Sequence, residues 1–163
     1  MDIPANLIQE VKRGNVVLFL GAGASIGATD GKGNGIHGVA SLTQELSKRF
    51  LGGQVDDYPL AEVSELAISE SDLVRVQEFV HDLFVDFEPA NFHQNIPLYK
   101  WKSIYTTNYD LLIEKSYQNV LKKQQVLKPI YSSSDSLETV ITSIDDLPYI
   151  KLHGCITKTD EDY

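Results

Sequence analysis

The chain has 163 residues, and its 14 Lys and Arg against 23 Asp and Glu give a formal net charge of −9. This length suits one domain or part of a larger one, and 42% hydrophobic with 23% charged residues excludes a disordered or collagen-like chain. Basic residues do not cluster beyond Lys122 and Lys123, which disfavours nucleic acid and membranes as partners. The single cysteine, Cys155, excludes an internal disulfide and a four-thiolate zinc site. No secretory signal or long apolar run is found, so we expect a soluble, cytoplasmic protein.

The first half of the chain contains one predicted strand among predicted helices. Apolar residues recur at helical spacing over residues 4–13, and Gly14 would end that helix. The continuous apolar run 16–20 predicts a strand buried on both faces, as in parallel sheets. The glycine-rich stretch from 21 to 38 has no regular spacing and predicts a mobile loop. Helical spacing then predicts helices over 39–50, 59–69 and 72–84.

The second half alternates strands with helices. Residues 102–106 predict a buried strand and residues 109–121 the helix after it. Two short strands are predicted at 125–131 and 148–152, separated by a Ser-rich, acidic connection. The alternation predicts an α/β fold with a parallel, Rossmann-like sheet, interrupted by a helical insertion at about 52–98.

A glycine turn, Gly21-Ala22-Gly23, follows the first predicted strand. Such a turn lets the backbone approach a pyrophosphate and direct its amide groups at it. The motif departs from the dehydrogenase pattern, because Ile26 stands where a third glycine is expected. An ordinary dehydrogenase is therefore disfavoured, and the turn taken alone could equally serve only close packing of a helix on the sheet.

Two further polar motifs lie at predicted strand exits. In Thr106-Thr107-Asn108-Tyr109-Asp110, either Asn108 or Asp110 could simply cap the next helix. In Lys151-Leu152-His153-Gly154, the histidine taken alone could be structural. Open α/β sheets bind ligands at the carboxyl ends of their strands, and the glycine turn, Asn108 with Asp110, and His153 would all lie at that edge. We therefore expect a ligand site there.

The ordered set Gly21-Ala22-Gly23-Ala24-Ser25, Thr106-Thr107-Asn108-Tyr109-Asp110 and Leu152-His153-Gly154 resembles the sirtuins. It is most similar to the bacterial sirtuin-like domains that act as NAD hydrolases in anti-phage defence, as is the lead-in Phe92-His93-Gln94-Asn95-Ile96-Pro97. The resemblance runs from about Val16 to His153 and implies a sheet of the sirtuin type.

The resemblance also implies roles for particular residues. Gly21, Ala22, Gly23 and Ser25 would hold the phosphates and adjoining ribose of NAD, with Thr107 at the ribose contact. Asn108 would orient a water beside the nicotinamide ribose, Asp110 would contact the carboxamide, and His153 would be the general base. A histidine base suits this reaction because nicotinamide is already a cationic leaving group and needs no strong acid. NAD would be the substrate, and no metal is expected.

Departures from the family pattern bear on the reaction. Classical deacylating sirtuins carry a Gly-Ile-Pro-Asp-Phe-Arg segment where this chain has Gly27-Ala28-Thr29-Asp30-Gly31-Lys32, and they carry a four-cysteine zinc module. They also place a glutamine where Thr107 stands. Deacylation thus loses ground to NAD hydrolysis. The family's sheet continues beyond the strand before His153, so we expect a domain that lacks its C-terminal part and a chain of low solubility that could be inactive alone.

The function expected first is an NAD glycohydrolase that depletes NAD in anti-phage defence. Control by a further domain, a partner protein or homo-oligomerisation is implied by the resemblance. The alternatives are a non-catalytic module that binds NAD or ADP-ribose or supports assembly, and an NAD-dependent protein deacylase. A Cys155–His153 nucleophile pair and a metal site built from histidines are weaker candidates, because neither has the usual spacing.

Overall fold

The computed structural model describes residues 3–132 and 135–157. Its first elements are helix α1, Ala5–Arg13, and strand β1, Val17–Leu20, as the sequence predicts. Gly14 ends α1 in the left-handed region, with φ of 74°, and its N–H bonds to the carbonyl of Val11. A glycine suits this position because other residues adopt positive φ only with strain.

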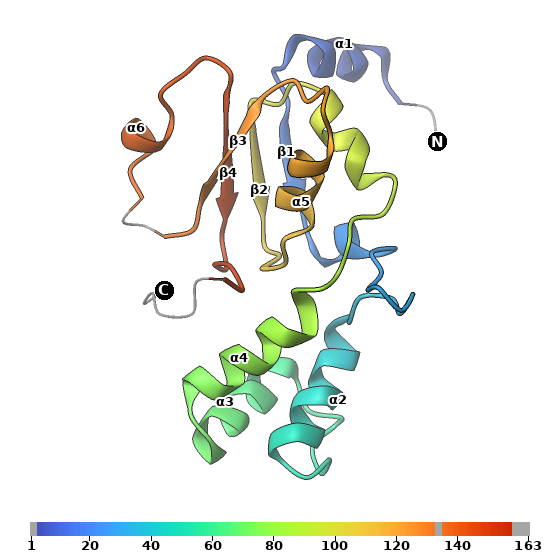
Figure 1. The fold of residues 1–163 in the computed structure, drawn as a ribbon, viewed down its shortest axis with the longest axis vertical. Helices are drawn as coiled ribbons and strands as arrows, with labels where there is room; N and C mark the ends of the chain where they lie inside the picture. The colour runs from blue at the N-terminus through green and yellow to red at the C-terminus, as the bar shows by residue number, and fades with distance from the viewer. Residues whose placement is uncertain (1–2, 133–134, 158–163) are drawn as a thin grey trace.

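The centre of the fold is a parallel sheet of four strands in the order β1-β2-β4-β3 (Figure 1). The remaining strands are β2, Ser103–Thr106, β3, Val126–Ile130, and β4, Asp146–Lys151. Leu20 pairs with Thr106, and Thr106 pairs with Lys151. The carboxyl ends of β1, β2 and β4 are therefore level, and the loops after them leave the same edge of the sheet.

Helices pack on the sheet through a shared apolar core. Helix α5, Leu112–Asn119, and the 3-10 helix η2, His93–Leu98, contact one another beside the sheet, and a short helix α6, Leu137–Val140, precedes β4. The core of this layer consists of buried residues from two strands and α5, namely Ile104, Ile113, Tyr117, Leu147 and Tyr149. This arrangement confirms the predicted α/β class with a Rossmann-like parallel sheet.

A separate helical unit lies beyond the carboxyl ends of the strands (Figure 1). It contains α2, Val39–Phe50, α3, Leu60–Glu70, and α4, Leu73–Phe84. These helices share a second core made of Leu42, Leu46, Val63, Ala67, Val76 and Phe84 together with Ile156. Because α2 contributes to this core, the helical unit of the structure includes residues before Gly52.

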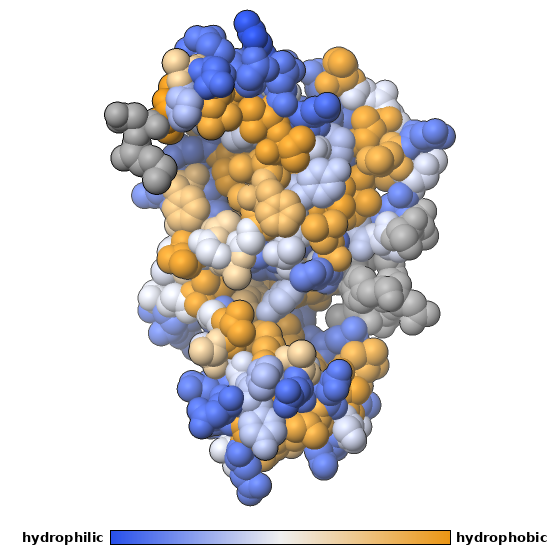
Figure 2. Space-filling view, turned by 180° about the vertical axis from the view of Figure 1, so that it is seen from behind, coloured by the Kyte–Doolittle hydropathy of each residue, from blue (hydrophilic) through white to orange (hydrophobic). Residues whose placement is uncertain are grey.

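Strand β1 differs from its prediction. Val17 is 48% exposed and Phe19 is 62% exposed, so the strand is not buried on both faces. Val17 and Phe19 alternate with the less exposed Leu18 and Leu20, so one face of the strand is open. The strand also lies at the edge of the sheet, where β2 is the one strand that pairs with it among the described residues. Figure 2 shows apolar residues gathered on the half of the molecule that holds the sheet.

Within the part of the chain that the structure describes, no helix combines the length and apolar character needed to cross a membrane.

The glycine-rich segment after β1 is more ordered than the mobile loop that the sequence predicts. It contains a short 3-10 helix η1, Ala22–Ser25, and Thr29 pairs with Gly35 and Glu88 in isolated bridges. Ala28, in the middle of this segment, is fully buried.

Candidate functional site

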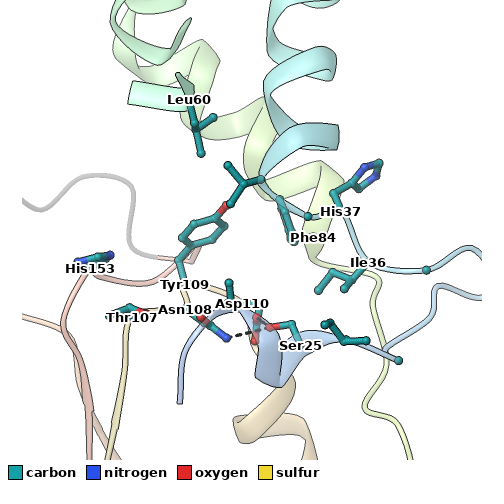
Figure 3. A pocket seen from close by; sticks show the side chains of 16 residues that line it. Ser25, Ile36, His37, Leu60, Phe84, Thr107, Asn108, Tyr109, Asp110 and His153 are labelled. Atoms are coloured by element: carbon teal, nitrogen blue, oxygen red, sulfur yellow. Dashed lines mark hydrogen bonds between the residues drawn. The ribbon is translucent and has the colours of Figure 1, made fainter. Parts of the chain in front are cut away.

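A cavity of about 480 Å³ lies between the carboxyl edge of the sheet and the helical unit (Figure 3). Its polar floor comes from the loops after β1 and β2, and its apolar wall comes from residues such as Leu60 and Phe84 of the helical unit. His153, from the loop after β4, lines the same cavity. The structure thus brings three strand exits to one cavity, as the strand order requires.

Asn108 is held firmly at the floor of this cavity. Its backbone N–H donates to the Oγ1 of Thr106 at 2.9 Å, and its side-chain Nδ2 donates to the carbonyl of Gly21 and to Ser25 Oγ, both at 2.9 Å. The two amide hydrogens are therefore used within the protein. The amide oxygen Oδ1 makes no hydrogen bond to another described residue, so it can accept one from a water or a hydroxyl.

Asp110 belongs to the same hydrogen-bond network, through Ser25. Ser25 Oγ donates to its Oδ2 at 2.6 Å, and Asp110 is 6% exposed. Its other oxygen accepts from the N–H of Leu112 at 3.1 Å. Helix α5 begins at Leu112, three residues later than the sequence predicts, and its N-cap residue is Leu111. Neither Asn108 nor Asp110 is therefore a simple helix cap, because both link the β2 exit to the turn after β1.

The glycine turn lies against this network. Ala22 and Ser25 line the cavity, whereas Gly21 and Gly23 are not among its lining residues. Within the described ranges, the N–H groups of Ala22 and Gly23 have no hydrogen-bond acceptor, because they begin η1. A Cβ at Gly23 would meet no atom of the described residues within 4 Å, which leaves space beside its backbone for a ligand. Thr107 lines the cavity too, and its N–H donates to the carbonyl of Leu20.

His93 fixes the turn from the far side, a role that the sequence did not reveal. Its ring is 1% exposed, its Nδ1 accepts from the N–H of Ala90 at 3.0 Å, and its Nε2 lies 2.6 Å from the carbonyl of Ala24. Because Nδ1 accepts, Nε2 carries the proton and donates to Ala24. This buried histidine is therefore a structural support of the glycine turn.

His153 lies on the other side of Tyr109 from Ser25 (Figure 3). Its ring is exposed to the cavity and makes no hydrogen bond to another described residue. Tyr109 packs edge-on against Phe84, with ring centroids 5.3 Å apart. Burial, with a smaller contribution from the charge of Asp110, raises the pKa of Tyr109 to about 12. Tyr109 is therefore a neutral phenol at physiological pH and forms an apolar partition within the cavity.

The weaker candidates gain no support from the geometry. Cys155 is 4% exposed and its Sγ lies 3.4 Å from the Nζ of Lys151, whereas His153 is exposed. Across residues 3–132 and 135–157, no group of three or more His, Cys, Asp or Glu side chains could hold a metal ion.

Comparison with known proteins gives one family. Residues 102–163 match the family model for the SIR2-like domain, over a range that includes Asn108, Asp110 and His153. No curated protein matches the chain.

Proposed function

We propose that the protein binds NAD and cleaves its nicotinamide–ribose bond by hydrolysis, as an NAD glycohydrolase, and the match of residues 102–163 to the family model for the SIR2-like domain supports this. The observation that carries this proposal is the cavity at three strand exits, which places a hydrogen-bonded Asn108 with a free amide oxygen in the same space as His153. Its volume of about 480 Å³ is large enough for part of a dinucleotide.

The chemistry fits these side chains. Water attacks C1′ of the ribose, the C1′–N bond breaks, and its electron pair neutralises the pyridinium as nicotinamide leaves. Asn108 Oδ1 orients the attacking water, and His153 accepts the proton that the water loses. The products are nicotinamide, ADP-ribose and one proton. The apolar ring of Phe84 and the neutral Tyr109 exclude bulk water from the reacting bond.

The remaining groups would hold the substrate. Asp110 would contact the carboxamide of nicotinamide, and the turn Gly21, Ala22, Gly23 and Ser25 would hold the phosphates and adjoining ribose. The N–H groups of Ala22 and Gly23, which have no acceptor among the described residues, support this role because unpaired amides at the start of a helix can bind anions. Thr107, beside the turn, would contact the ribose.

The biological role belongs to the same proposal. An NAD hydrolase of this kind would serve anti-phage defence in the cytoplasm by depleting NAD. Such an activity must stay silent until it is needed, so a further domain, a partner protein or self-assembly would control it.

The test is NAD consumption by the purified chain, with nicotinamide, ADP-ribose and cyclic products separated by chromatography. Asn108→Ala and His153→Ala should each lower turnover by about a hundredfold or more, because each removes a group that acts on the reacting atoms. Asn119→Ala and His81→Ala, which change the same residue types outside the cavity, should leave turnover unchanged.

Three other results would contradict the hydrolase or its proposed site. Binding of NAD without turnover in the folded protein would favour the non-catalytic module. Nicotinamide release that requires an acylated peptide would favour the deacylase. Equal turnover in Asn108→Ala and Asn119→Ala would place the chemistry elsewhere.

A further inference from the structure

The lysine at the end of β4 has a buried ammonium group. The side chain of Lys151 is fully buried, and its Nζ lies 5.8 Å from the centre of the Tyr149 ring. A buried ammonium is unfavourable unless hydrogen bonds and an opposite charge compensate it. Its partners therefore indicate what it does.

Two of those partners are main-chain carbonyls of the loop after β2. Nζ donates to the carbonyl of Tyr109 at 3.2 Å and to that of Asp110. A third partner is Glu114 on α5, whose Oε1 is 3.0 Å away, and a fourth is the Sγ of Cys155 at 3.4 Å. One ammonium thus joins the exit of β4 to the loop that carries Asn108 and to the helix that follows.

The Tyr109 carbonyl holds the His153 turn at both ends. It accepts from Lys151 Nζ before the turn and from the backbone N–H of Ile156 after it, at 3.0 Å. Between these two donors the chain reverses at Gly154, with φ of 74°, and the N–H of Gly154 returns to the carbonyl of Lys151. Both ends of the turn that carries His153 are therefore hydrogen-bonded to the carbonyl of Tyr109, the residue after Asn108.

From these contacts we propose that Lys151 is a positioning residue for the reaction. It holds the turn that carries His153 against the loop that carries Asn108, so that both side chains can act on the same nicotinamide–ribose bond. The inference rests on the proposed hydrolase function. Lys151 does not line the cavity, so it acts through the peptide it holds and not on the substrate.

A purely structural ion pair is the competing explanation. Burial raises the pKa of Glu114, and the ammonium of Lys151 opposes that rise. The second oxygen of Glu114, Oε2, is buried and has no hydrogen-bond partner among the residues that the structure describes. Removing Lys151 alone would leave Glu114 without its counter-charge and could unfold the protein for that reason.

The experiment therefore removes the pair together. In Glu114→Gln the ammonium of Lys151 keeps the two carbonyls and an amide oxygen in place of Oε1 as acceptors, so its hydrogen bonds remain. Lys151→Met with Glu114→Gln, or with Glu114→Leu, removes the ammonium and all of those bonds. Replacing a buried ion pair by neutral groups of similar volume is often tolerated. The double variant with the melting temperature closest to that of the parent protein is used.

We expect Glu114→Gln to keep kcat within about twofold, and the double variant to lose about tenfold or more, because small displacements of reacting groups have effects of that size. The dissociation constant for ADP-ribose should stay within about threefold, since the glycine turn is unchanged. Equal kcat in the two variants, a loss confined to KM, or failure of both double variants to fold would overturn the proposal.

A readout without substrate separates this inference from the proposed function. In ¹H–¹⁵N spectra of the free protein, the Asn108 side-chain amide and the Gly154 amide should shift or broaden in the double variant and not in Glu114→Gln. If the parent protein does not consume NAD, the hydrolase proposal fails while these resonances still report whether Lys151 holds the two loops. Unchanged resonances would refute the positioning role.

Discussion

Individual side chains that bond to distant main-chain groups determine the shape of the candidate site. His93 is the clearest case, because it accepts from the N–H of Ala90 and donates to the carbonyl of Ala24, which lies 69 residues before it in the sequence. Both partners of the ring are main-chain groups, and nearly every residue carries the same N–H and carbonyl. A sequence therefore contains no partner residue that would reveal such a histidine.

Replacing His93 with phenylalanine tests this support. The ring would keep its stacking on Phe92, now 4.0 Å between centroids, but the Ala90 N–H and the Ala24 carbonyl would lose their partner. We expect the free energy of unfolding, measured in urea, to fall by about 1–3 kcal/mol, the usual cost of leaving buried polar groups unsatisfied. The proposed function further predicts weaker NAD binding in this variant, because η1 loses its anchor.

His81→Phe is the matched control, since His81 lies on α4 with a side chain that is 34% exposed. It should change the unfolding free energy by less than about 0.5 kcal/mol. Equal losses in the two variants would mean that the bonds of His93 contribute nothing specific.

The residues named from the sequence differ in how well they could be foreseen. The strand-exit rule placed Asn108, Asp110 and His153 at one edge, and the structure has all three beside one cavity. Their roles toward NAD remain predictions. The Ser25–Asp110 bond and the buried Lys151 could not be foreseen, because they depend on how separate loops meet in space.

At the scale of elements, apolar spacing predicted most helices and strands to within a few residues. It predicted α2 over 39–50, as found, because the apolar residues of helical spacing extend over the same residues as the helix itself. It failed at the start of α5, where the polar residues that a helix could have used as a cap take part in the site network. It also began β4 at Pro148, two residues after Asp146.

Asp146 explains that last difference and gives a pH-dependent prediction. Its Oδ2 accepts from the N–H groups of Thr142 and Ser143, both at 2.9 Å, and shapes the turn into the strand. The Thr142 N–H contributes most to lowering the pKa of this carboxyl, followed by the Ser143 N–H and the charge of Lys128. The ionised form thus stabilises the fold above the ordinary aspartate pKa of about 3.9, and this is lost as pH falls through the lowered value.

Asp146→Asn should therefore be less stable than the parent protein at neutral pH, and the difference should close as the pH falls into the acid range. Thermal unfolding across that range measures it. Asp145→Asn changes the neighbouring, exposed carboxylate and should match the parent protein throughout. A stability gap for Asp146→Asn that is independent of pH would show that shape, not charge, is responsible.

At the scale of the whole molecule, the sheet is covered unevenly. The sequence predicted a β1 buried on both faces because its apolar run resembles a central strand, but the strand lies at an edge. The apolar pattern of one segment does not predict where that strand lies in the sheet, because the strand order depends on how all the segments assemble. Nor does it show which face of a strand stays uncovered, as the face of β1 that carries Val17 and Phe19 does.

These exposed side chains predict self-association of the isolated chain through β1, since unpaired apolar edges are templates for pairing. Phe19→Lys should raise the concentration at which light scattering detects oligomers and leave the melting temperature nearly unchanged. Leu121→Lys is the control, because Leu121 is 97% exposed and the substitution alters the net charge of −9 equally. Association that both variants reduce alike, or that neither reduces, would contradict a role for β1.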